Sequence, residues 1–175
     1  MKRITKVWCS SLPYKRLLSH NHKEIKNKLQ KNHGVVLPEW NELSKKDRKY
    51  LYVFVHDCAI QVWYNDGTGE TLYIKAGWMT DLASVPTFLR SFVDDNAPWI
   101  LLAALWHDAG FAAHFWGFRQ CNYNFLDIMT CEKAPNIRKR LAFAAVNNPI
   151  VYHTHYKKSA KEIAHERKFL KVEKI

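Results

Sequence analysis

The sequence predicts a single α+β domain, in which a small antiparallel β-sheet is followed by an antiparallel helical hairpin and further helices. Three short runs are apolar, aromatic and β-branched, as strands are: residues 50–55, 59–64 and 71–74. The Gly-rich cluster at 65–69 suits a turn between the last two of them. Residues 99–115 are apolar nearly all round, which is typical of a buried helix. A turn at Gly117 separates this helix from a second one over 119–131, so the two helices should lie antiparallel.

The flanking segments predict further elements. Residues 1–13 read as an arm or a short strand, and residues 14–31 as a basic helix that Gly34 closes, because Gly suits the left-handed position past a helix end. Residues 77–86 are expected to leave the sheet as a structured loop. A third helix is expected over 136–146, and a final charged helix over 157–172.

Charge divides the chain into three parts. Residues 1–50 contain 13 Lys or Arg and 4 Asp or Glu, a net charge of +9; residues 51–150 have a net charge of −2 and residues 151–175 of +4. We therefore predict a basic N-terminal extension (1–49), a core domain (50–150) and a basic C-terminal segment (151–175). Basic ends favour an acidic partner, such as nucleic acid, an anionic membrane surface or an acidic protein; the alternative is a solvated surface.

Several classes of protein are disfavoured by the sequence. No window approaches the roughly 18 consecutive apolar residues of a transmembrane helix. Lys2 and Arg3 are not followed by the apolar run of a secretory signal. The four cysteines have no CxxC spacing, which favours reduced thiols over a disulfide framework or a zinc site. The phosphate-binding loop, the GxSxG elbow and the dinucleotide-binding fingerprint are all missing.

The central motif consists of residues 77–86, 105–108 and 119–122. Its second part places His107 and Asp108 in the most apolar helix of the chain. Ionisable side chains in such a place cost free energy unless they are paired or hydrogen-bonded. Four side chains of the motif are the candidate partners: Asp81, Ser84, Arg119 and Asn122.

This pattern resembles the phage-associated domain of unknown function 1353 family. Members share a segment like Thr-Asp-Gly-Ala-Ser-Val-Pro, a helix that ends in His-Asp, and an Arg-x-x-Ala-Asp that opens the next helix. The matching residues are Thr80, Asp81, Ala83, Ser84, Val85, Pro86, His107, Asp108 and Arg119. Asn122 stands where the family usually has Asp, and the resemblance extends over residues 50–148. It implies a phage or prophage origin, and hence a virion or accessory protein that acts in assembly, ejection or lysis, in the host cytoplasm or the virion, with other virion proteins as partners.

The motif is compatible with a structural role, which we take as the main interpretation. In it Arg119 pairs with Asp81 or Asp108, His107 bonds a backbone carbonyl, and the cluster fixes the loop onto the helix pair. The orienting residues of this cluster are expected to be Thr80, Ser84, Arg119 and Asn122.

A metal-dependent hydrolase is the first alternative, because the motif is similar to secreted phospholipases A. In those enzymes the His of a His-Asp pair activates water, the adjacent Asp binds calcium, and an Asp on the antiparallel helix orients the His. The resemblance implies that His107 is the general base, that Asp108 ligates a divalent cation such as calcium, that Asp81 is a further catalytic candidate, and that Asn122 takes the orienting position. An amide accepts a hydrogen bond from imidazole but brings no charge to the imidazolium.

Two further alternatives remain. A phosphohydrolase of the His-Asp type needs an upstream His, a His-Asp pair and a downstream Asp on helices. The available residues are His56, Asp57, His107, Asp108 and Asp127. His56 lies at the end of a predicted strand, which disfavours that scaffold. The last alternative is a nucleic-acid-binding protein that uses its basic ends.

Overall fold

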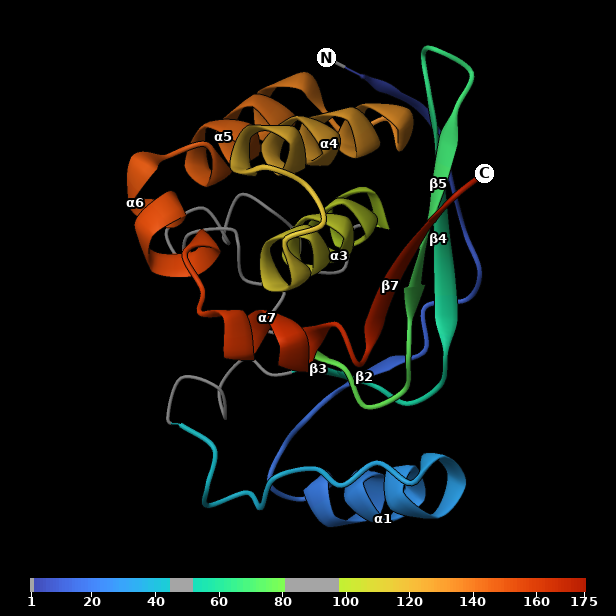
Figure 1. The fold of residues 1–175 in the computed structure, drawn as a ribbon, viewed down its shortest axis with the longest axis vertical. Coiled ribbons are helices and arrows are strands. Elements are labelled where there is room, and N and C mark those ends of the chain that lie inside the picture. The colour runs from blue at the N-terminus through green and yellow to red at the C-terminus, as the bar shows by residue number, and fades with distance from the viewer. Residues whose placement is uncertain (1, 45–51, 81–97) are drawn as a thin grey trace.

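The structure is a computed structural model, and it describes residues 2–44, 52–80 and 98–175 (Figure 1). It confirms the α+β class: the chain has two antiparallel sheets, a helical hairpin and further helices, and one strand of the larger sheet follows the helices. The expected loop residues 81–86 lie outside the described residues.

The larger sheet has four strands in the order β1-β4-β5-β7. These strands are β1 (Ile4–Cys9), β4 (Cys58–Tyr64), β5 (Gly69–Ile74) and β7 (Leu170–Lys174). All three strand pairs are antiparallel. The hairpin of β4 and β5 confirms the predicted turn, where the Tyr64 amide donates to the Thr68 carbonyl at 2.8 Å.

A second sheet has three short strands in the order β2-β3-β6. They are β2 (Tyr14–Arg16), β3 (Tyr52–Phe54) and β6 (Met79–Thr80). The expectation that the chain leaves the sheet from residue 77 was wrong in part, because Met79 and Thr80 pair with Val53 and Tyr52. Gly77 makes the preceding bend: its φ is +89°, and a Cβ there would come within 2.4 Å of Val35 Cγ1.

The helical part follows the prediction closely. Its helices are α3 (Pro98–Ala113), α4 (Phe118–Cys131) and α5 (Asn136–Val146), followed by α6 (Pro149–Val151), the π-helix η2 (Tyr152–Tyr156) and α7 (Ala160–Glu166). Helices α3 and α4 form the predicted hairpin, and α5 has the predicted bounds. A capping box of Ser159 and Glu162 starts α7.

The main core lies between the four-stranded sheet and the helical hairpin. Strand β4 alternates between buried and partly exposed residues, as a half-covered strand does. Its buried residues Ile60 and Val62, with Leu72 and Ile74 of β5, pack in one cluster with Trp106 of α3 and Phe125 of α4, among others. In Figure 1, α3 and α4 lie on one side of this sheet.

The N-terminal helix is shorter than predicted. Residues 14–16 form β2 instead of the start of a helix, and α1 extends over His22–His33. Pairing of β2 with the distant β3 overrides the local helical pattern. Gly34 closes α1 with a φ of +66°, as predicted. Helix α1 packs on a separate apolar cluster that includes Leu17, Ile25, Leu29, Val53 and Ala76.

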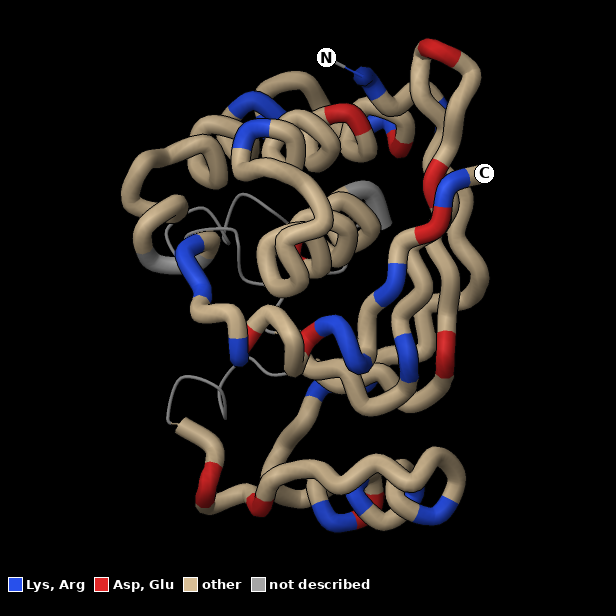
Figure 2. The backbone as a smooth tube through the Cα atoms, in the orientation of Figure 1, with Lys and Arg blue, Asp and Glu red and all other residues tan. Residues whose placement is uncertain are grey.

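Both basic ends contribute strands to the larger sheet. The predicted helix over 157–172 was too long: α7 covers Ala160–Glu166, and residues 170–174 form β7 beside β5. The larger sheet therefore crosses the predicted boundaries at 49/50 and 150/151. Figure 2 shows Lys and Arg gathered on α1 and around α7 and β7, whereas α3 has none.

Candidate functional site

His107 lies at the centre of the helical hairpin and is 0% exposed. Its Nε2 atom is 2.8 Å from Oδ1 of Asn122, which faces it from α4. The rings of Phe111 and Phe125 pack around the imidazole, with centroids 3.9 and 5.4 Å away. Because this environment is apolar and dry, the hydrogen bond is stronger than the same bond in water, and its loss would be more costly.

Asn122 extends the contact to a third helix. Its Nδ2 atom donates to Oδ1 of Asn147, at the end of α5, at 3.1 Å. The Asn122 oxygen then faces His107, and an amide oxygen only accepts hydrogen bonds. In the neutral ring this contact therefore assigns the proton to Nε2, so that Nδ1 is the unprotonated nitrogen.

Asp108 connects α3 to the smaller sheet. Its Oδ2 atom accepts a hydrogen bond from the Thr80 hydroxyl at 2.7 Å, and its Oδ1 atom is 3.7 Å from Nδ1 of His107. The side chain is only 10% exposed. Thr80, Asp108, His107, Asn122 and Asn147 thus form a continuous polar cluster across β6, α3, α4 and α5, which we call the His-Asp cluster.

The structure brings some of the predicted site residues together and separates others. Thr80, His107, Asp108 and Asn122 lie in the His-Asp cluster. Arg119 does not pair with Asp108; it is exposed on α4, so that expected ion pair was wrong. The expected partners Asp81 and Ser84 lie outside the described residues. The described partner of His107 Nε2 is the Asn122 side chain.

The residues of a His-Asp phosphohydrolase are dispersed. His56 packs edge-on against His33, and the Asp57 carboxylate accepts from the Ala76 amide at 2.8 Å. Asp127 binds Arg3. Within residues 2–44, 52–80 and 98–175, no three or more His, Cys, Asp or Glu side chains gather as metal ligands do. The described partners of His56, Asp57 and Asp127 do not support the phosphohydrolase alternative.

The ion pair of Arg3 and Asp127 was missed by sequence reasoning. Asp127 is buried on α4, and its two carboxylate oxygens each lie 2.9 Å from Arg3 Nε. The Ile4 amide also donates to Oδ2, at 2.9 Å. This contact attaches β1 to α4 across 124 positions of sequence. Sequence reasoning also missed Asn147, because Asn147, like Arg3 and Asp127, lies outside the motif.

The thiols are poor nucleophiles. All four cysteines are free. Burial raises the pKa of Cys9 and of Cys58 to about 12, and raises the pKa of Cys121 still further. They are therefore protonated at neutral pH, whereas cysteine catalysis requires a thiolate.

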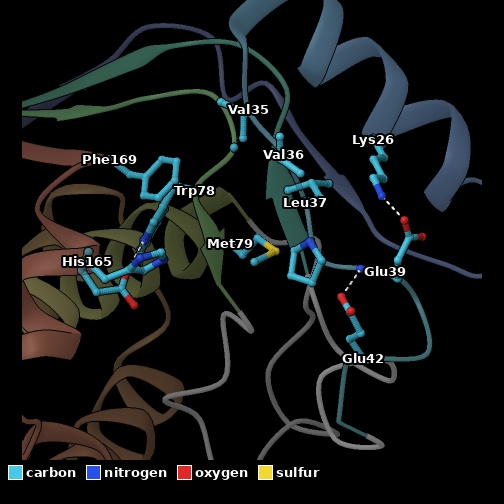
Figure 3. A pocket seen from close by; sticks show the side chains of 13 residues that line it. Lys26, Val35, Val36, Leu37, Glu39, Glu42, Trp78, Met79, His165 and Phe169 are labelled. Carbon is cyan, nitrogen blue, oxygen red and sulfur yellow. Dashed lines mark hydrogen bonds and ion pairs between the residues drawn. The ribbon is translucent and has the colours of Figure 1, made fainter.

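A pocket of about 550 Å³ lies between the α1 region and α7 (Figure 3). Val35, Val36 and Leu37 line one side and Trp78 and Phe169 line the other. Trp78 Nε1 donates to Glu166 at 2.9 Å, and Lys26 pairs with Glu39. Met79, the chain neighbour of Thr80, lines this pocket, but no residue of the His-Asp cluster does. The pocket and the cluster are therefore separate.

The architecture defines a class of α+β proteins with a helical hairpin packed on one face of an antiparallel sheet. The family model described as protein of unknown function (DUF1353) matches residues 57–146. Because this segment is 90 of the 175 residues, the chain belongs to that family. The match includes β4, β5, β6 and the helices α3 to α5, but neither β1 nor β7. No curated protein and no solved structure matches the chain. Among the described helices, none is long and apolar enough to cross a membrane.

Proposed function

We propose that this chain is a phage-encoded virion or accessory protein, acting in assembly, ejection or lysis, whose His-Asp motif forms a structural polar cluster. The motif resemblance supports the phage setting. The observation that supports the structural role is the complete burial of His107, with its Nε2 atom bonded to Asn122. The cluster joins four elements, and buried polar networks can specify one arrangement of such elements.

Substitution of Asn122 tests the structural role. Asn122→Ala leaves the His107 donor and the Asn147 oxygen without this partner, so the free energy of unfolding should fall by about 2–4 kcal/mol. Asn136→Ala is the matched control, since it makes the same substitution at an exposed position of α5, and it should change stability by less than about 0.5 kcal/mol. Urea unfolding measures both. An Asn122→Ala variant as stable as the wild type would contradict the structural role.

A hydrolase is the second candidate, and one observation favours it. The contact with Asn122 assigns the ring proton of neutral His107 to Nε2, so the unprotonated nitrogen is Nδ1, which lies 3.7 Å from Asp108 Oδ1. A base in this state can take a proton from water. Calcium takes about six to eight oxygen ligands, and among the described residues Asp108 and Thr80 bring side-chain oxygens to this point.

Asn122→Asp separates the two candidates. A carboxylate would stabilise the imidazolium of a catalytic His107, and exchanges between Asp and Asn at such positions change rates by up to about 10⁴-fold. A hydrolase should therefore gain at least about tenfold in phospholipid or phosphoester hydrolysis. A structural cluster should show no hydrolysis in either protein, and calorimetry should detect no divalent-cation binding that Asp108→Asn abolishes.

A further inference from the structure

The four-stranded sheet has a second face that no described helix covers (Figure 1). Side chains alternate across a strand, so residues paired in register share a face. Trp8 pairs with Gln61, Gln61 with Thr71, and Thr71 with Glu173. Lys6 pairs with Trp63, and Tyr73 pairs with Lys171. Thr71 shares this side of the sheet but is 0% exposed. We define the remaining residues as the open face: Lys6, Trp8, Gln61, Trp63, Tyr73, Lys171 and Glu173.

Three aromatic side chains from three strands lie on the open face. Trp8 of β1 is 50% exposed and Tyr73 of β5 is 40% exposed, while Trp63 of β4 is partly buried. Trp8 and Trp63 are diagonal neighbours on adjacent strands, a relation that separates Cα atoms by about 7–8 Å. Exposed aromatic rings on a sheet keep apolar surface in contact with water, and a partner that covers this surface gains hydrophobic free energy. The three rings therefore provide a stacking surface.

Lysines accompany these rings. Lys6 Nζ lies 4.9 Å from the centroid of Trp63. Lys171 is opposite Tyr73 and forms an ion pair with Glu173, which neutralises the carboxylate of this face. Below Tyr73 the face continues into a concavity of about 400 Å³, whose lining includes Lys75, Lys168 and Lys171. Two other charged side chains of this concavity have partners within the protein. Asp57 accepts from the Ala76 amide, and Arg167 donates to carbonyls at the end of α3.

We propose that the open face binds single-stranded nucleic acid, with bases stacked on Trp8, Trp63 and Tyr73 and phosphates paired with Lys6, Lys75 and Lys168. Aromatic rings flanked by cations are the recurring chemistry of single-strand binding, because every base has a π-face and every nucleotide a charge. Stacking requires unpaired bases. In addition, the major groove of a duplex admits a helix or a two-stranded ribbon, and this sheet has four strands. A neutral sugar would stack on the rings but would gain nothing from the lysines.

Fluorescence anisotropy with the full chain tests the proposal. The probes are labelled oligo-dT and oligo-U of about 15 nucleotides, titrated from about 50 to about 200 mM salt. Trp8→Ala should weaken binding about 5- to 150-fold, and Trp8→Phe should restore most of it. The double variant Lys6→Ala/Lys75→Ala should lower the slope of log affinity against log salt by about 1.4, since each phosphate contact on a single strand contributes about 0.7.

Matched variants elsewhere serve as controls. Tyr152→Ala removes an exposed aromatic of η2, and Lys28→Ala/Lys31→Ala removes two charges from α1; neither should reproduce the effects of the open-face variants. Urea unfolding should show that Trp8→Ala remains folded. A preference for either oligo-dT or oligo-U supports the proposal, and a titration with oligo-dU then separates the effect of the sugar from that of the thymine methyl group. The proposal is overturned if neither probe binds at the lowest salt, if Trp8→Ala binds as the wild type does, or if a neutral oligosaccharide binds more tightly than both probes.

Discussion

The two faces of the four-stranded sheet are built from the same strands but from different side chains. On the covered face, Ile60, Val62, Leu72 and Ile74 are fully buried against α3 and α4. On the open face, the same strands carry Trp63, Gln61 and Tyr73, with Trp8 and Lys6 beside them. The covered face therefore contributes most to stability, whereas the open face is free to change with little effect on folding. Packing in the core therefore does not explain the aromatic rings of the open face.

Leu72→Ala and Tyr73→Ala compare the two faces at neighbouring positions of β5. Leu72 is fully buried, so its truncation should lower the free energy of unfolding by about 2–5 kcal/mol through lost burial and a cavity. Tyr73 projects from the open face, so its truncation should cost less than about 1 kcal/mol. Chemical denaturation measures both values. Equal losses at the two positions would mean that the open face is part of a packed core, and the comparison would fail.

Asp127→Asn tests whether the stability of the covered side of the sheet also depends on a buried charge. The substitution removes the charge that binds Arg3 but keeps an oxygen for the Ile4 amide. Hydrogen bonds to charged groups contribute about 1.5–3 kcal/mol, so stability should fall by about 2 kcal/mol. Glu24→Gln, in an exposed ion pair of α1, is the control and should leave the urea midpoint unchanged. A midpoint that shifts equally in both variants would show that burial adds nothing to the Arg3–Asp127 pair.

The thiols of the covered face predict an effect on stability that appears only at alkaline pH. Burial raises the pKa of Cys9 and Cys58 to about 12, whereas an unfolded thiol titrates near about 8.5. Above that pH the unfolded state binds fewer protons than the folded state, so stability should decline as the pH rises from about 8.5 toward 12. Thermal unfolding of the wild type and of Cys9→Ala/Cys58→Ala at a series of alkaline pH values measures this difference. The double variant should lose less stability over the same range; parallel curves would assign the decline to other groups.

Local patterns were sufficient to predict the hairpin of β4 and β5 and the helices α3, α4 and α5. They failed for β2 and β7, because short strands depend on partners far away in sequence: β2 pairs with β3, and β7 with β5. Lys171 and Glu173 alternate with Leu170 and Val172, but four such residues also fit a charged helix. A strand of three to five residues has too little periodicity to be recognised alone.

The same limit applies to the His-Asp cluster. A helical hairpin with a short turn necessarily places part of its second helix opposite the first, so Asn122 could be named as a partner of His107. Asn147 could not, since its position depends on how α5 packs on α4. Arg119 was assigned to the cluster from its place in the motif, but the helix turns its side chain into solvent.

The strand order has a consequence for synthesis on the ribosome. Strand β5 pairs with β4 soon after both are made, but its other edge waits for β7, and Ile74 and its partner Leu170 are 96 positions apart. At about 5–20 residues per second, that interval lasts roughly 5–20 s. During it, the Thr71–Tyr73 stretch of the nascent chain is a bare strand edge, able to pair with another nascent chain. Slow translation between these two strands should therefore reduce the yield of folded protein, even though it changes no residue of the finished sheet.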